Sequence, residues 1–315
     1  MSEFVVPVVF IVFNRPEQTG KVFAAIRRVQ PHHLLIISDG ARDNDDNEKC
    51  RRVRDIVANI DWDCKVERRY SEINLGCKKN ISTGLDWVFS KVEEAIILED
   101  DCLPDTSFFS FCAELLEKYR NDPRVMQICG YNFASKNNVL YDESYLFSRI
   151  GMIWGWATWK RAWQHYDVNI STWPKVKRSG KLKNILGDEA IVNHYNHLFD
   201  NYYAQKIDSW DSQWFLACWL NNGLSAISCN NLIQNIGFDP KNAHKTADPN
   251  DPRAHIPVKP TSFPLIHPSR MIVDPKYDAY IFRYQLSINH SLKQRLLWFL
   301  KKKMPILHTL LKRLK

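Results

Sequence analysis

The chain has 315 residues, of which 45% are hydrophobic and 25% charged, and its net charge is +8. It has no low-complexity tract, and its eight cysteines are scattered without a CxxC pair, which excludes a zinc ribbon or a disulfide scaffold. No apolar run is long enough to span a bilayer, so we expect a cytoplasmic globular protein with reduced thiols.

Apolar runs and helical patterns alternate through the first third of the chain. The apolar runs, predicted as strands, are 6–13, 34–38, 64–70 and 95–98. The helical patterns between them are 16–29, 48–60 and 78–90. This alternation predicts an α/β fold with a mainly parallel, Rossmann-like sheet flanked by helices. A further helix capped by Thr106 and a strand in 124–131 extend it.

Polar residues follow the end of each predicted strand. They are Arg15 after the first strand, Asp39 after the second, Lys78 and Lys79 after the third, and Glu99, Asp100 and Asp101 after the fourth. Ligands of parallel α/β sheets bind beyond the carboxyl ends of the strands. The sequence therefore predicts a binding site at this edge.

The acidic triplet "EDD" at 99–101 directly follows a buried-type run, where like charges repel unless a cation lies nearby. Carboxylates in this position suit Mn²⁺ or Mg²⁺ shared with phosphate oxygens, and Arg15, Lys78 and Lys79 are candidate phosphate partners. Asp39, in "SDG", is either a hydrogen-bonding partner for a base edge or ribose, or a turn-forming residue.

Two tryptophan-rich stretches mark the second half of the chain. "GMIWGWATWKRAW" (151–163) offers Trp154 and Trp156 for stacking on a sugar, although residues 156, 159 and 163 also have the helical spacing of a core face. "KIDSWDSQWFL" (206–216) places Asp208 and Asp211 beside Trp210, as a catalytic base or a helix cap.

Two further segments are candidates for substrate contact. The loop "NIGFDPKNAHKTADP" (235–249) contains His244 and has the composition of a mobile lid. The segment 290–315 is basic and rich in leucine, which indicates either contact with an anionic membrane surface or a C-terminal helix packed on its own domain.

Taken in order, these motifs resemble those of the GT-A nucleotide-sugar glycosyltransferases, over about residues 5–250. They are similar to bacterial family-2-like enzymes and, more remotely, to the N-acetylglucosaminyltransferase I group, whose metal motif is also EDD. The resemblance implies that Arg15 and Asp39 hold the nucleoside, that Lys78 or Lys79 lies near the base or diphosphate, and that Glu99 and Asp100 contact ribose and sugar. It further implies Asp101 as metal ligand, Asp211 as base and His244 in the closing loop. The second stretch reads WDSQW where the family has WDDW.

The resemblance implies an inverting, metal-dependent transfer from a UDP-sugar to a hydroxyl of a glycan or lipid-linked acceptor, in surface polysaccharide synthesis. Trp154, Trp156 and Trp210 would contact the acceptor. We expect a nucleotide-sugar-binding half (1–135), an acceptor-side half of the same domain (136–285) and a basic C-terminal segment (286–315). The protein would lie on the inner face of the cell membrane, with no nucleic-acid partner.

Other functions fit fewer features. A sugar-phosphate nucleotidyltransferase would carry a Gly-rich basic loop after the first strand, where this chain has Asn14-Arg15-Pro16. A phosphotransfer enzyme would have a nucleophilic aspartate after the first or third strand. A non-catalytic membrane-surface binding module is the remaining alternative.

Overall fold

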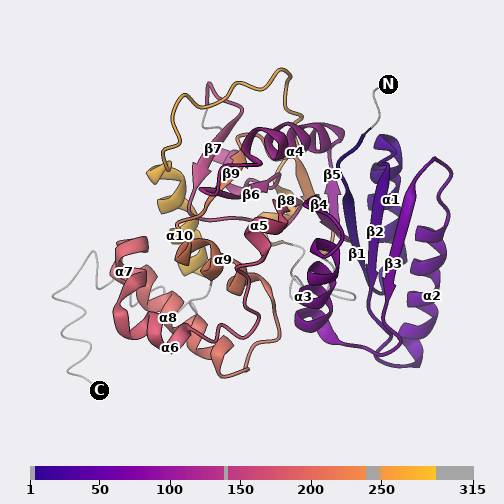
Figure 1. Cartoon of the computed structure of the whole chain (residues 1–315), viewed down its shortest axis with the longest axis horizontal. Helices are drawn as coiled ribbons and strands as arrows, with labels where there is room; N and C mark the ends of the chain where they lie inside the picture. Colours follow the sequence, from indigo (N-terminus) through magenta and orange to yellow (C-terminus); the bar gives the residue numbers. More distant parts are fainter. Residues whose placement is uncertain (1–3, 138–140, 239–247, 249, 289–315) are drawn as a thin grey trace.

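The computed structural model describes residues 4–137, 141–238, 248 and 250–288, and these form a large sheet with helices on both faces (Figure 1). Strands and helices alternate in the first half. They are β1 (Val8–Val12), α1 (Pro16–Val29), β2 (His33–Ser38), α2 (Asn44–Ala58), β3 (Lys65–Tyr70), α3 (Gly76–Phe89), β4 (Glu94–Glu99), β5 (Cys102–Pro104), α4 (Thr106–Tyr119) and β6 (Val125–Cys129).

The predicted strands and helices of this half are confirmed, with three differences at helix starts. Helix α3 begins at Gly76, two residues earlier than predicted. Helix α2 begins four residues earlier than predicted, because Asp43 caps it by accepting a hydrogen bond from the Asp46 backbone N–H. Helix α4 is capped by Asp105, whose carboxylate accepts from the Ser107 N–H at 2.8 Å, and not by Thr106.

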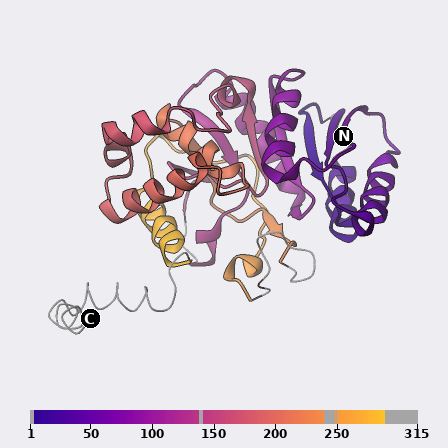
Figure 2. The ribbon, with the colours of Figure 1, turned by 90° about the horizontal axis from the view of Figure 1, so that it is seen from below.

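The second half is mostly helical. Its elements are η1 (Phe133–Asn137), β7 (Tyr145–Ser148), β8 (Trp156–Trp159), α5 (Lys160–Trp163), α6 (Trp173–Ser179), α7 (Lys181–Leu186), α8 (Glu189–Tyr203), α9 (Asp211–Leu220), β9 (Leu224–Ser228), β10 (Ile233–Asn235), η2 (Pro252–His255) and α10 (Pro275–Ile288). Helices α6, α7 and α8 lie at the end of the molecule opposite β1–β3 (Figures 1 and 2). No described helix is long and apolar enough to cross a membrane.

The strand order in the sheet is β3-β2-β1-β4-β8-β6-β9-β7, and β5 and β10 form a separate antiparallel pair. Strands β3, β2, β1 and β4 are parallel, β6 pairs parallel with β9, and β8 and β7 run the other way. The predicted α/β class with a mainly parallel sheet is therefore confirmed.

Alternate residues of β1 show how the sheet is covered. Val8, Phe10 and Val12 belong to a buried cluster that includes residues of α1, α2 and α4. Val9 and Ile11 point to the opposite face and join residues of α3. Both faces of β1 are thus apolar and covered, which explains its continuous hydrophobic run.

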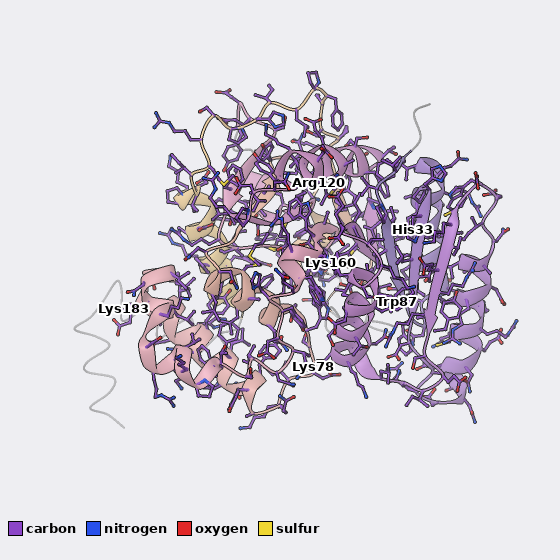
Figure 3. The ribbon with its side chains drawn as sticks, in the orientation of Figure 1. His33, Lys78, Trp87, Arg120, Lys160 and Lys183 are labelled. Atoms are coloured by element: carbon purple, nitrogen blue, oxygen red, sulfur yellow. The ribbon has the colours of Figure 1, made fainter. Side chains whose placement is uncertain are left out.

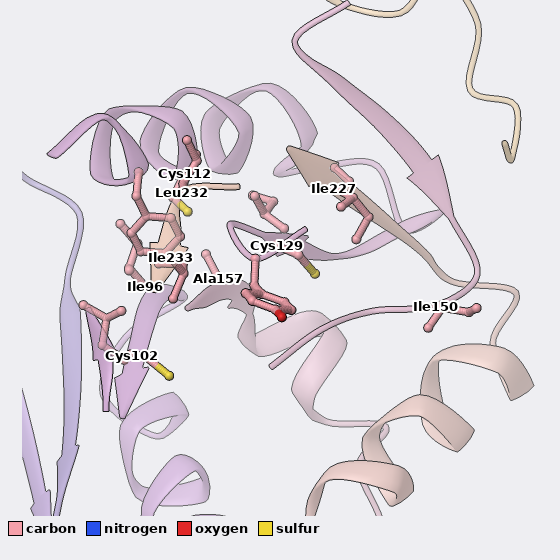
Figure 4. Close-up of a cluster of buried hydrophobic side chains, with 14 of the residues drawn as sticks. Ile96, Cys102, Cys112, Cys129, Ile150, Ala157, Ile227, Leu232 and Ile233 are labelled. Atoms are coloured by element: carbon pink, nitrogen blue, oxygen red, sulfur yellow. The ribbon is translucent and has the colours of Figure 1, made fainter. Parts of the chain in front are cut away.

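The core continues from the first half of the chain into the second. Ile96 of β4, Ala157 of β8 and Ile227 of β9 lie in one buried cluster together with Cys112 of α4 (Figure 4). Strand β4 pairs directly with β8, so the hydrogen-bonded sheet contains strands from both sides of residue 135, the predicted boundary between the two halves.

Candidate active site

A cleft of about 570 Å³ opens at the carboxyl ends of β1 and β4. The chain runs from β1 outward to β2 and β3, then returns past β1 to β4, so the strand order reverses between β1 and β4. Such a reversal leaves a crevice at the sheet edge, where open α/β sheets bind ligands. The first turn of α3 and the segment 208–211 form its walls.

Arg15 and the acidic triplet face each other across this reversal. The Arg15 Nη1 donates to Asp101 Oδ2 at 2.6 Å, and its Nε lies 3.5 Å from Asp100 Oδ1. Burial disfavours the charged guanidinium, but the carboxylates of Asp100 and Asp101 outweigh it and raise the pKa of Arg15. In the structure, Arg15 is therefore the cation that the adjacent acidic charges require.

Burial and mutual repulsion raise the pKa of two acids in the triplet. The pKa of Glu99 is raised to about 8 by desolvation and by the charges of Asp101 and Asp100. The pKa of Asp100 is raised to about 6 by desolvation, against the opposing effect of Arg15, and its Oδ2 accepts from the Phe13 N–H at 3.2 Å. At neutral pH, the triplet carries less than its full negative charge.

These shifts predict that stability depends on pH. Both carboxyls bind their protons more tightly in the folded chain than in the unfolded one, so their contribution to stability is lost as pH rises through about 6 and about 8. We expect Glu99→Gln to melt at a higher temperature than the wild type at pH 8, and by a much smaller margin at pH 5. Glu72→Gln, at an exposed position, should show no such trend. Equal Glu99→Gln margins at both pH values would contradict the assignment.

Asp39 lies in the cleft wall, but its carboxylate is already engaged. Its Oδ1 accepts from the N–H groups of Gly40 and Leu75, both at 2.9 Å. Its Oδ2 accepts from the Gly76 N–H at 3.1 Å and from Asn74 Nδ2 at 3.3 Å. Burial raises the pKa of Asp39, and these backbone donors oppose the rise. Asp39 thus fastens the turn before α3 to the end of β2.

Asp211 begins α9 and reaches the cleft from the opposite wall. Its Oδ1 accepts from Tyr202 Oη at 3.0 Å, from Ser209 Oγ at 2.8 Å and from the Ser212 N–H at 2.9 Å. No described residue bonds to its Oδ2. The charge of Asp211 also contributes to the raised pKa of Glu99, so the two acids are electrostatic neighbours. The structure thereby brings together acids about 110 residues apart in the chain.

Lys78 and Lys79, of which one was expected near the base or diphosphate of a nucleotide, do not line the cleft. Both are on α3, but the residues of that helix that line the cleft are Gly76, Cys77, Asn80 and Ile81. Lys78, labelled in Figure 3, instead donates from Nζ to Gln205 Oε1 at 2.7 Å, and Lys79 is exposed. Residues 78 and 79 project from the opposite side of the helix, because each residue advances about 100° around the axis.

The tryptophans separate into core and cleft positions. Trp156 is fully buried in β8, within 6 Å of Trp210 and Trp214 between ring centroids, so its predicted contact with an acceptor is wrong. Residues 156–159 are a strand and not part of a helix. Trp210 borders the cleft but is only 2% exposed. Trp154 lines the cleft and is partly exposed, with its ring edge-on to Tyr131 at 4.8 Å.

Because Trp156 packs against three other indoles, its truncation should act on stability. We expect Trp156→Ala to lower the free energy of unfolding by about 3–5 kcal/mol, as measured by urea denaturation. Trp154→Ala, at a partly exposed position, should cost much less. A Trp156→Ala protein as stable as the wild type would show that this indole cluster is not part of the core.

Sequence reasoning missed several residues that the second half contributes. Arg253, on η2, lines the cleft and forms a two-point ion pair with Asp251, at 2.6 and 2.9 Å. Its guanidinium lies 5.7 Å from the centroid of Trp154. Gly237 approaches the triplet so closely that a Cβ on it would lie 2.3 Å from Asp101 Oδ2. The glycine in the 235–249 stretch was the available signal for this approach.

Some expectations fall outside the described residues, namely His244 and the basic part of the C-terminal segment. Within the described ranges, no three His, Cys, Asp or Glu side chains converge closely enough to hold a metal ion by themselves.

No family model and no curated protein sequence matches the chain. Among solved structures it is similar to 4-diphosphocytidyl-2C-methyl-D-erythritol synthase from Anaerococcus prevotii (10% identity, 71% of this chain and 88% of that one, TM-score 0.36). It is also similar to the galactosyltransferase LgtC (10%, 70% and 73%, 0.36) and to mouse xyloside xylosyltransferase 1 (13%, 68% and 82%, 0.33). Since these TM-scores lie below 0.5, the function proposed for this chain rests on its own geometry.

Proposed function

We propose that the chain is a glycosyltransferase of the GT-A type, which moves a sugar from a UDP-sugar to a hydroxyl group of an acceptor with inversion. The observation that supports this most is the cleft itself, which has Arg15 and the acidic triplet at the strand reversal and Asp211 on the facing wall. A diphosphate leaving group needs cations, and an attacking hydroxyl needs a base; this cleft supplies both.

The carboxylate of Asp101 suits a divalent cation such as Mn²⁺ or Mg²⁺, because carboxylate oxygens are the ligands these ions prefer. The Gly237 backbone lies close to Asp101, and because glycine has no side chain, Asp101 Oδ2 can keep its position beside Arg15. When bound, the cation would be held by Asp101 and phosphate oxygens, and it would supply positive charge to the leaving diphosphate. Arg15 supplies further positive charge from the protein.

Asp211 is proposed as the base. Three donors occupy its Oδ1, which fixes the side chain and leaves Oδ2 to accept the acceptor's hydroxyl proton. The acceptor oxygen forms its bond to the anomeric carbon as the bond to UDP breaks on the opposite face, and UDP departs with the electron pair. The proton ends on Asp211, and the anomeric centre is inverted.

The acceptor and the location of the enzyme remain proposals. Trp154 is the one predicted acceptor contact that is both partly exposed and in the cleft wall. We propose a glycan or lipid-linked acceptor in surface polysaccharide synthesis, with the basic segment 286–315 on the inner face of the membrane. The halves 1–135 and 136–285 would bind the donor and acceptor respectively.

The experiment that tests the function is thermal shift with UDP-, GDP-, dTDP- and CMP-sugars, with and without Mn²⁺. We expect one UDP-sugar to raise the melting temperature only with metal, since a ligand of the folded state stabilises it by mass action. Asp101→Ala should lose this shift, and Lys79→Ala, outside the cleft, should keep it. If no nucleotide sugar shifts the wild type under any condition, the proposal fails and a binding module becomes the better hypothesis.

A further inference from the structure

The carboxylate of Asp39 has no acceptor capacity left for a nucleobase. An ionised carboxylate offers about four lone-pair positions. Donors from Gly40, Leu75, Gly76 and Asn74 take these positions at 2.9–3.3 Å. A base that bonded to Asp39 would have to break the turn that the same carboxylate holds.

Two amide side chains of the cleft wall, Asn74 and Asn80, do have hydrogen-bonding capacity to spare, and their orientations are fixed. Asn74 Nδ2 donates to the Gly40 carbonyl at 2.7 Å and to Asp39, so the Asn74 Oδ1 remains as an acceptor. Asn80 Oδ1 accepts from Arg69 Nη1 at 3.4 Å; since arginine cannot accept, the other atom of Asn80 is the donor Nδ2.

Asn80 is a buried side chain that borders the cleft. It is 4% exposed, and no described residue accepts a hydrogen bond from its Nδ2. Arg69, which donates to Asn80 Oδ1, also donates from its Nη2 to Thr83 Oγ1 at 2.8 Å. Its Nδ2 is not one of the fully buried side-chain atoms that lack a partner, so it reaches the cleft surface, where it can donate to a ligand.

The strand order places the turn with Asn74 further along the sheet edge from Arg15 and Asp101, and Asn80 follows it in α3. Asp101 and Arg15 follow β4 and β1, whereas Asp39 and the turn with Asn74 follow β2 and β3, further along the same edge. A nucleotide whose diphosphate lies at Arg15 and Asp101 extends its base toward Asn74 and Asn80.

We infer that Asn74 and Asn80 read the edge of the donor's uracil, and that Asp39 holds the turn that presents them. This inference rests on the proposed function. The uracil N3–H donates to Asn74 Oδ1, and the Asn80 Nδ2 donates to uracil O4. Cytosine reverses both groups, with an acceptor at N3 and a donor at N4, so this pair disfavours it.

The test is calorimetric titration of the full chain with UDP and with CDP, in the presence of Mn²⁺. We expect the wild type to bind UDP at least about tenfold more tightly than CDP, the scale of one unsatisfied buried polar group. Asn80→Asp turns the donor into an acceptor while retaining an oxygen for Arg69, and should abolish this preference. The added negative charge weakens the binding of UDP and of CDP to the same extent, so the ratio of the two Kd values is the readout.

Asn47→Asp makes the same chemical change at an exposed position and should retain the wild-type ratio. The inference is overturned if Asn80→Asp also keeps the wild-type preference for UDP, and in that case the proposed function stands. It is likewise overturned if the wild type binds neither nucleotide, and in that case the proposed function falls with it. Melting temperatures of the unliganded variants verify that both are folded.

Discussion

Replacement of Asp211 with asparagine is expected to lower kcat by about 10²–10⁴-fold, the range that a general base contributes. Asparagine keeps an oxygen for the donors Tyr202, Ser209 and the Ser212 N–H, so the start of α9 should be preserved. The amide cannot accept the hydroxyl proton, so we expect the rate of the chemical step to fall while the affinity for UDP stays unchanged. Turnover of a UDP-sugar by the variant, together with its UDP affinity, measures this effect.

Asp208→Asn provides a matched control, because Asp208 lines the same cleft three residues earlier. Its effect on kcat should be far smaller than that of Asp211→Asn. Equal losses in the two variants would mean that the wall needs negative charge in general and that Asp211 is not the base. A loss of UDP affinity as large as the loss of kcat would place Asp211 in donor binding.

The second large effect is expected from a single methyl group at Gly237. A Cβ there would lie 2.3 Å from Asp101 Oδ2 and 2.8 Å from Arg15 Nη1, well inside contact distance. Gly237→Ala must therefore displace the carboxylate or the guanidinium. Since a displacement of about 1 Å at a site can cost about 10²-fold in rate, we expect a loss of at least that size in kcat/KM.

Gly20→Ala is the control for this substitution, because a Cβ on Gly20 in α1 meets no atom within 4 Å. It should leave activity unchanged and raise the melting temperature slightly, since alanine is the better helix former. A Gly237→Ala enzyme with normal kcat/KM and normal metal-dependent donor binding would show that Asp101 does not need its present position.

The architecture of the first half follows from its hydrophobic runs. Strands β1, β2 and β4 are buried on both faces, so their continuous apolar sequences are a direct consequence of the fold, whereas the edge strand β3 has no buried residue. The start of α2 was misplaced because its first turn is polar, and only Asp43 marks it. Strand β8 was harder to predict, because spacing of tryptophans at 156, 159 and 163 also fits a helix.

The candidate site was predicted where it depends on strand ends, and missed where it depends on the rotation of a helix or on long-range packing. Arg15, Asp39 and the triplet lie in the cleft because parallel strands share a carboxyl edge. Lys78 and Lys79 lie outside the cleft, because a shift of one residue along α3 turns a side chain by about 100° around the helix axis. Arg253 reaches the cleft through packing against Trp154, which no local pattern indicates.

The cluster of buried indoles also gives the protein an optical property. Trp156 and Trp210 are stacked with 5.8 Å between centroids and 26° between planes, and Trp163 and Trp214 adjoin them. Chromophores this close couple their electronic transitions, so the circular dichroism of the native protein should contain an exciton signal from this cluster. Trp210 immediately precedes Asp211, and the signal therefore reports on the wall that carries the proposed base without any added label.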